Sequence, residues 1–185
     1  MKALKRAAAL LAACALCVQL FSGCGKSVDP STIEYIQLEQ PKEGEDIAIV
    51  DTSMGEITVL LYTDEVPEVV QNFKDLVNRG FYDGQVVFHV EPAAGAVATG
   101  SSTPDGNGGD SNTGKPKKAE YSSNLWPFSG SVAMLCYEAG SIFKKTNYYD
   151  SRFFFIGDIP VRDELVSEME QYNFPAMMKN TFIQY

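Results

Sequence analysis

The sequence predicts a mostly β domain with a few helices. Two runs of β-forming residues, Ile47–Asp51 and Ile57–Tyr62, are joined by a short turn that contains Gly55, so they predict a hairpin. The aromatic run Phe153–Phe155 is typical of a strand. Between these segments, apolar residues recur at helical spacing from Val69 to Val77. With 185 residues and 45% hydrophobic content, the chain suits one globular domain with accessory segments.

Residues 1–23 have the pattern of a processed export signal, which takes no part in the fold. A positive start is followed by the apolar run Ala7–Phe21, whose 15 residues are fewer than the ~20 that a membrane-spanning helix needs. The run ends in Phe21-Ser22-Gly23-Cys24, which resembles a bacterial lipobox. We therefore expect a lipoprotein signal peptide, with Cys24 as the lipidated residue. The alternative is an ordinary secretory signal followed by an incidental cysteine.

The charge excludes some partners. The formal net charge is −9, and without residues 1–23 it becomes −12, from 12 lysine and arginine residues against 24 acids. Such a surface does not suit nucleic acid, which requires cationic side chains. It also disfavours binding to anionic lipid, so we expect the lipid anchor to hold the protein at the membrane. Residues 24–45 are polar and contain Pro30 and Pro41, so we expect a flexible tether. Within it, Ile33–Leu38 could pair as an edge strand.

Neither a disulfide nor a metal site is expected. Cys14 and Cys17 lie in the signal, which leaves Cys136, in an apolar run, as a buried and inert thiol. His89 is the only histidine. The segment Asp105–Asp110 has the composition of a calcium loop but lacks the required spacing of oxygen ligands. We therefore expect no metal and no cofactor.

The remaining elements follow from local patterns. A helix should begin near Pro67, which suits a first helical position, and end before Gly80. Its expected buried stripe consists of Val69, Val70, Phe73, Leu76 and Val77. The other expected segments are a strand at Val86–Val90, a small-residue segment after it, a flexible loop at Ser101–Lys118, strands at Gly130–Leu135 and Asp150–Gly157, and a helix at Asp163–Tyr172.

Several of these segments also carry a resemblance to a known family. In chain order they are Thr52–Ile57, Asn72–Phe73, Gly80–Gly84, Phe88–His89, Gly130–Leu135 and Asp150–Gly157. In this order and spacing, from about Ile47 to Gly157, the chain resembles the cyclophilins, which are β-barrel peptidyl-prolyl cis-trans isomerases. The resemblance implies an antiparallel β-barrel capped by helices over residues 46–185. Because the family's last strands have no counterpart here, we expect this domain to be incomplete at its C-terminus.

Isomerisation needs an apolar pocket for proline and a donor that favours the twisted amide, because amide resonance sets a barrier of ~18–20 kcal/mol. In the family, an arginine directly after the Phe-His pair supplies the donor; here that residue is Val90. Other pocket positions of the family fall on Gly95, Ala96 and Ala98. One hypothesis is that Arg152 replaces the family's catalytic arginine, because its guanidinium is always charged and offers several N–H donors in a rigid arrangement. The alternative is that Arg152 forms a salt bridge with Asp150.

The resemblance implies that Phe88, His89, Met134 and Phe154 bind the peptide. His89 could instead be a half-buried strand residue bonded to nearby backbone. We therefore expect an isomerase that acts on proline-containing or unfolded polypeptides and assists the folding of exported proteins. Its expected location is the outer side of the cell membrane, held by a lipid anchor. The alternative is a non-catalytic chaperone or adaptor that binds peptides on the same scaffold.

Overall fold

The computed structural model describes residues 29–92, 95–141, 144–158, 163–171 and 180–181. The elements are, in chain order, the 3-10 turns η1 (Pro30–Thr32) and η2 (Ile36–Leu38), β1 (Ile47–Thr52), β2 (Gly55–Leu60), α2 (Pro67–Asn78), β3 (His89–Glu91), β4 (Ala96–Thr99), β5 (Lys117–Lys118), β6 (Val132–Ser141), β7 (Lys144–Ile156) and α3 (Asp163–Gln171). The export signal expected at residues 1–23, with Cys24, lies outside the described residues. Within them, no helix combines the length and the apolar character needed to cross a bilayer.

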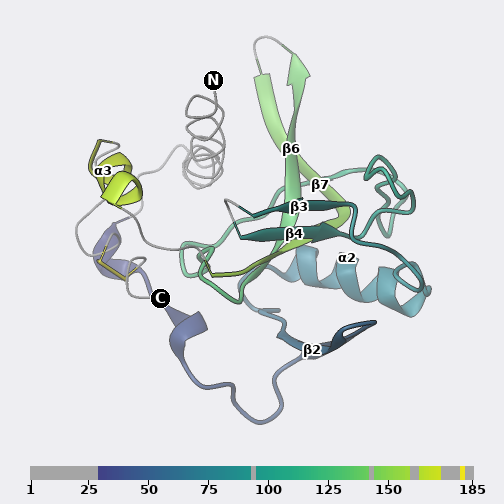
Figure 1. Cartoon of the computed structure of the whole chain (residues 1–185), viewed down its shortest axis with the longest axis horizontal. Helices are drawn as coiled ribbons and strands as arrows, with labels where there is room; N and C mark the ends of the chain where they lie inside the picture. The colour runs from purple at the N-terminus through teal and green to yellow at the C-terminus, as the bar shows by residue number, and fades with distance from the viewer. Residues whose placement is uncertain (1–28, 93–94, 142–143, 159–162, 172–179, 182–185) are drawn as a thin grey trace.

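The described strands form two antiparallel sheets (Figure 1). One is the β1–β2 pair, and the other has the order β3-β4-β7-β5, with β6 also paired to β7. β7 is the centre of the larger sheet, because it pairs with β4, β5 and β6. The mostly β architecture expected from the sequence is therefore present. Among the described residues, however, the strands form these two separate sheets rather than one closed barrel.

The predicted β1–β2 hairpin is confirmed. Thr52 and Gly55 form its last pair, and the hydroxyl of Thr52 donates to the carbonyl of Gly55 at 2.7 Å. Gly55 has a φ of 125°, a conformation that glycine adopts without steric cost. The outward residues Ile47 and Ile49 stay more than half exposed.

Helix α2 begins at Pro67 as predicted, and Gly80 follows it with a φ of 66°. Its buried face differs from the expected apolar stripe. Val77 is 47% exposed, whereas Asn72 is fully buried. The predicted stripe is therefore wrong at Val77, and a polar residue occupies the centre of the buried face.

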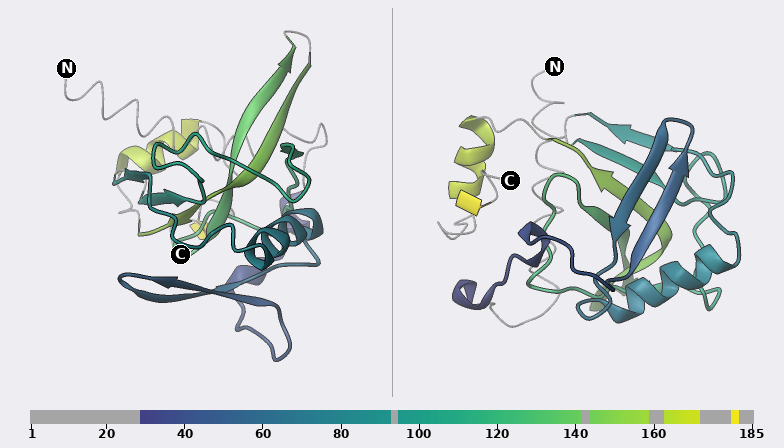
Figure 2. Two further views of the ribbon diagram at one scale, coloured as in Figure 1. Left: turned by 90° about the vertical axis from the view of Figure 1, so that its right-hand side faces the viewer. Right: turned by 90° about the horizontal axis from the view of Figure 1, so that it is seen from below.

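The strands of the larger sheet differ in extent from the predicted ones. β6 and β7 run on beyond the predicted strands, and their outer parts form a hairpin that stands away from the rest of the protein (Figure 1 and the left view of Figure 2). The strand expected at Val86–Val90 begins only at His89, and Val86 and Val87 are half exposed. β4 forms in the small-residue segment, for which the sequence predicted no strand.

Part of the expected tether contacts the domain. Ile33 packs in one cluster with Trp126 and Phe128, and Tyr35 lies against it. The side chain of Gln37 donates to the carbonyl of Trp126 at 2.9 Å and accepts from its N–H at 2.5 Å. The edge strand expected at Ile33–Leu38 is wrong, because that segment contains the turn η2 and pairs with no described strand.

The C-terminal helix is confirmed within its described range. α3 begins at Asp163 and extends to Gln171, and Leu165 and Met169 are buried.

Candidate active site

One face of the larger sheet carries a cross-strand row that contains Phe154. His89 lies opposite Ala98, Ala98 lies opposite Phe154, and Phe154 lies opposite Ala133 on β6. Residues directly opposite each other in antiparallel strands project from the same face. The phenyl ring of Phe154 is therefore flanked on both sides by alanine, and His89 lies exposed at the end of the row.

The neighbouring Phe153 projects from the other face. Its side chain is 4% exposed, and its ring contacts those of Phe73 and Tyr82 at centroid distances of 5.9 and 5.6 Å. Met134 lies opposite Phe153 and so faces this core. Our sequence interpretation grouped Met134 with Phe154 as peptide-binding, but the register places them on opposite faces of the sheet.

The residues at the family's groove positions do not form one wall, because only Ala96 and Ala98 take the Phe154 face. Val90 is 54% exposed and lies opposite Val97, which lies opposite Phe155, so Val90 is on the other face from Phe154. Gly95 occupies a turn with a φ of 59°. Beside Phe154, Ala98 presents only a methyl group.

Arg152 lies two residues before Phe154 on β7, a spacing that puts both side chains on one face, although the β6–β7 pairing shifts register opposite Asp150–Arg152. Its Nε donates to Asp150 Oδ1 at 3.0 Å, and an Nη donates to Asp150 Oδ2 at 2.6 Å. This fork-like hydrogen bonding raises the pKa of Arg152. The salt bridge weighed as an alternative for Arg152 is thus formed, although it leaves the guanidinium on the candidate face.

The loop that precedes β5 packs closely against this pair. The second Nη of Arg152 donates to the carbonyl of Gly106 at 2.9 Å, and the guanidinium lies 5.6 Å from the ring centre of Tyr137. A Cβ on Gly106 would lie 2.5 Å from the Phe88 ring, and one on Gly109 would lie 2.2 Å from the Asp150 carboxylate. Phe88 is therefore half buried against the loop instead of standing in the Phe154 row.

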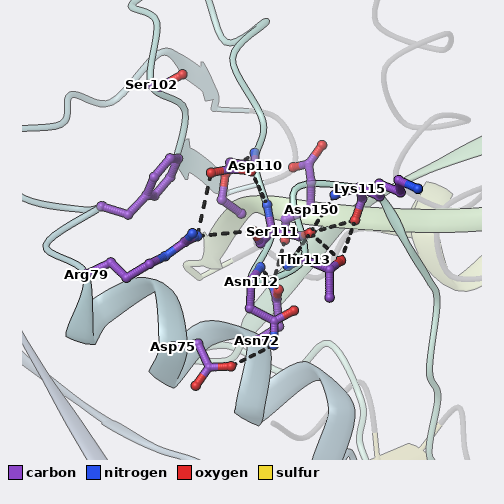
Figure 3. Close-up of polar contacts among 12 residues, drawn as sticks. Asn72, Asp75, Arg79, Ser102, Asp110, Ser111, Asn112, Thr113, Lys115 and Asp150 are labelled. Atoms are coloured by element: carbon purple, nitrogen blue, oxygen red, sulfur yellow. Dashed lines mark hydrogen bonds and ion pairs between the residues drawn. The ribbon is translucent and has the colours of Figure 1, made fainter.

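The second half of the same loop is held by helix α2 (Figure 3). The side-chain oxygen of Asn72 accepts from the backbone N–H of Asn112 at 2.8 Å. Asn112 donates to Asp75 at 2.7 Å, and Arg79 donates to the carbonyl of Ser111 at 3.1 Å. The sequence predicted a flexible loop here, but these contacts order it. Asn72 in the middle of an apolar stripe was the only sequence signal of this contact.

A polar cavity of about 240 Å³ lies between the loop and β7. It is lined by Asn107, Gly109, Asp110, Ser111, Gly114, Lys115, Pro116, Tyr137, Asp150 and Arg152. Arg152 lines this cavity and lies two residues before Phe154 on β7, whereas Phe154 and the two alanines beside it are not among the lining residues. The cavity and the Phe154 row together form one candidate site with an apolar part and a polar, charged part.

The described residues contain no group of three or more histidine, cysteine or acidic side chains that could hold a metal ion. In the segment that resembles a calcium loop, the carboxylate of Asp105 instead accepts from the hydroxyl of Thr103 and the amide of Asn107. These bonds lower the pKa of Asp105 to about 2. Cys136 is a free, half-buried thiol whose pKa is raised by burial.

Residues 47–160 match the family model of the cyclophilin type peptidyl-prolyl cis-trans isomerases. A putative peptidyl-prolyl cis-trans isomerase of Staphylococcus saprophyticus is 30% identical over 151 residues, which cover 81% of this chain and 73% of that protein. The spliceosome-associated protein CWC27 homolog of Danio rerio is 38% identical over 91 residues, 49% of this chain. A crystal structure of a Cryptosporidium parvum cyclophilin type isomerase superimposes with a TM-score of 0.52 at 24% identity, covering 60% of this chain and 65% of that one.

The chain therefore belongs to the cyclophilin-type peptidyl-prolyl cis-trans isomerase family, and its fold is cyclophilin-like. The match to the Danio rerio protein spans 18% of that protein's length. The fold and family expected from the sequence are thus confirmed.

Proposed function

We propose that the protein is a peptidyl-prolyl cis-trans isomerase whose site is the Phe154 face of the larger sheet. The observation that carries this proposal is the position of Phe154 and Arg152 on one face of β7, two residues apart. A proline ring needs an apolar surface, and a rotating amide needs a hydrogen-bond donor close to it. Family membership supports the same activity.

Each residue has a distinct role in this proposal. The ring of Phe154, whose cross-strand neighbours are Ala98 and Ala133, offers the apolar surface for proline. Arg152 is held by its bonds to Asp150 and Gly106. These bonds use three of the five N–H groups of the guanidinium, so the others can donate to a substrate amide. Donors that bond the twisted amide better than the planar one lower the barrier to rotation.

The test of this site is Arg152→Ala, with Lys145→Ala as the control. Both changes remove a cation from β7, but Lys145 lies on the exposed outer hairpin, where its partner is Glu138. We expect Arg152→Ala to abolish acceleration of cis-trans exchange in a proline peptide, and we expect amide dispersion to show that the domain is still folded, although destabilised by the unpaired Asp150 carboxylate. Unchanged exchange in Arg152→Ala would end the catalytic assignment of Arg152.

The second candidate function is peptide binding without catalysis. It is favoured by Val90 at the position of the family's arginine, and by the small side chains of Ala96 and Ala98. Small side chains give fewer apolar contacts to a proline ring, and each large apolar side chain missing from the contact weakens binding by about 1–3 kcal/mol. Peptide binding by the folded protein without faster exchange would establish this alternative.

We further propose that the protein works at the outer face of the cell membrane on exported, proline-containing or unfolded polypeptides. The support is sequence-based: the basic start, the short apolar run and the lipobox-like segment that ends at Cys24. Metabolic labelling with a fatty-acid analogue, in cells that express the full chain, tests it. We expect labelled, membrane-bound protein that becomes unlabelled in Cys24→Ala. Equal labelling of both proteins would contradict the anchor.

A further inference from the structure

We propose that Asp150 is a positioning residue for the peptide site, acting through Arg152 on the loop segment Ser102–Gly109. This inference rests on the proposed function for its link to peptide binding, although its effect on the loop can be measured independently. Asp150 itself would not touch the substrate. Asp150 would hold the guanidinium of Arg152 in one orientation. Through Arg152 it would also hold Ser102–Gly109, which forms part of the cavity wall, in place.

The carboxylate of Asp150 is buried and hydrogen-bonded. Its side chain is 7% exposed, and its oxygens accept from the backbone N–H of Arg152 at 3.0 Å as well as from the Nε and one Nη of the guanidinium. A carboxylate buried to this degree is stable only when it is paired and hydrogen-bonded. Arg152, whose side chain is 18% exposed, supplies both.

The guanidinium of Arg152, once fixed by Asp150, connects three segments of the chain. It bonds Asp150 on β7, donates to the carbonyl of Gly106 in the loop at 2.9 Å, and lies over the ring of Tyr137 on β6. Because the guanidinium is planar and its donors are rigidly arranged, fixing two of its nitrogens on Asp150 also fixes the direction of the third. The bond from Arg152 to Gly106 therefore depends on Asp150, and it adds to the bonds that Gly106 and Gly108 make within the loop.

The loop itself fits closely against its neighbours. Gly109 lies so close to Asp150 that a Cβ would be 2.2 Å from the carboxylate, and a Cβ on Gly106 would be 2.5 Å from the Phe88 ring. Asn107 and Gly109 line the cavity together with Arg152. A displacement of this segment therefore changes the shape of the cavity.

A positioning role of Asp150 differs from general stabilisation in which half of the loop it affects. The second half of the loop has anchors of its own, because Asn112 and Ser111 are bonded to Asn72, Asp75 and Arg79 of α2. Asp150→Asn should therefore release Ser102–Gly109 and leave Ser111–Lys115 in place. A merely structural role would loosen both halves alike.

The experiment compares the full chain, Asp150→Asn and the control Asp51→Asn. The control makes the same chemical change at an exposed residue of the β1–β2 hairpin. Amide hydrogen exchange is followed in both loop halves, and the binding and isomerisation of an Ala-Pro peptide are measured by NMR. In Asp150→Asn we expect faster exchange in Ser102–Gly109 only, and a Kd for the peptide raised about tenfold, since removing one partner of a buried bonded pair leaves the other unsatisfied.

A second variant keeps the proposal falsifiable if the charge change alone disturbs folding. Asp150→Asn combined with Arg152→Gln removes both charges but keeps two amides that can bond each other. We expect it to be more stable than Asp150→Asn alone, with Ser102–Gly109 still loosened because the contact to Gly106 is lost. Unchanged loop exchange and Kd in Asp150→Asn, or equal loosening of both halves, would overturn the proposal. Loosening of the first half without any measurable isomerisation by the unsubstituted chain would instead count against the proposed function alone.

Discussion

Ala98 lies directly opposite Phe154 across the β4–β7 pair, so the phenyl ring of the candidate site stands beside a single methyl group. Ala133 flanks the ring in the same way on β6. Ala98 is buried, at 6% exposure, so the part of this row that a ligand can reach is the partly exposed phenyl ring and not the alanine. Most of the apolar contact with a proline must therefore come from Phe154 itself.

Phe154→Ala should therefore weaken peptide binding more than it weakens the fold. We expect a loss of about 1–2 kcal/mol in binding, roughly a 5- to 30-fold rise in Kd, from the lost apolar contact. NMR titration with an Ala-Pro peptide measures it.

Phe153→Ala is the matched control, because Phe153 is the next residue but faces the core and contacts Phe73. This variant should lose about 3–5 kcal/mol of stability, as large-to-small changes in a packed core do. If Phe154→Ala proved the more destabilising of the two in urea unfolding, the assignment of the two faces would be wrong.

Glu120 should stabilise the start of helix α2. The N-cap residue Val66 has no side-chain acceptor, and Glu120 Oε2 instead accepts from the N–H groups of Glu68 and Val69 at 3.0 and 3.1 Å. Glu120→Ala should cost about 1 kcal/mol in the free energy of unfolding, the usual worth of a helix cap. Glu120→Gln keeps an acceptor oxygen, so equal losses in the two variants would argue against the capping role.

Acid should loosen the loop at Asp105. The pKa of this carboxyl is lowered to about 2, first by its bond from Thr103 and then by those from Asn107. A group with a lowered native pKa stabilises the folded state above its unfolded pKa of 3.8, and this contribution is lost as the pH falls through about 2. The amide of Asn107 should therefore exchange faster, relative to its intrinsic rate, as the pH falls from about 4 to 2. Asp105→Asn should show no such acid-dependent step, and a step that persists there must come from another group.

Gln37 should secure the N-terminal segment on the domain. Its side chain makes two bonds to the backbone of Trp126, the only tryptophan of the chain. Gln37→Ala should lose about 1–2 kcal/mol of stability and shift the Trp126 fluorescence to the red, because a buried N–H loses its partner and Trp126 gains solvent. Gln71→Ala, on the exposed side of α2, should change neither the stability nor the Trp126 fluorescence. If it caused the same red shift, the shift in Gln37→Ala could not be assigned to the contact with Trp126.

The sequence predicted correctly those features that depend only on residues close together in the chain. The hairpin at Gly55, the start of α2 at Pro67 and the salt bridge between Asp150 and Arg152 all depend on residues a few positions apart. Asp150 and Arg152 are two residues apart on a strand, and this spacing alone predicts that they lie on one face.

The errors concern long-range register and polar packing. The grouping of Met134 with Phe154 failed because the pairing of β6 with β7 decides which face each residue takes, and a shift of one position reverses it. β4 was missed because Ala96–Thr99 is short and lacks aromatic residues. The order of the loop depends on Asn72, and no periodic pattern signals a buried amide that bonds a segment 40 residues away.

The most direct test of the account is one NMR experiment on the full chain with an Ala-Pro peptide. Amide dispersion of the protein reports whether it is folded, and magnetisation exchange between the peptide's cis and trans signals reports catalysis. Uncatalysed exchange takes tens to hundreds of seconds, so acceleration is easily recognised. We predict accelerated exchange by the folded protein, lost in Arg152→Ala and retained in Lys145→Ala. A folded protein that shifts the peptide signals but leaves the exchange rate unchanged would contradict the account.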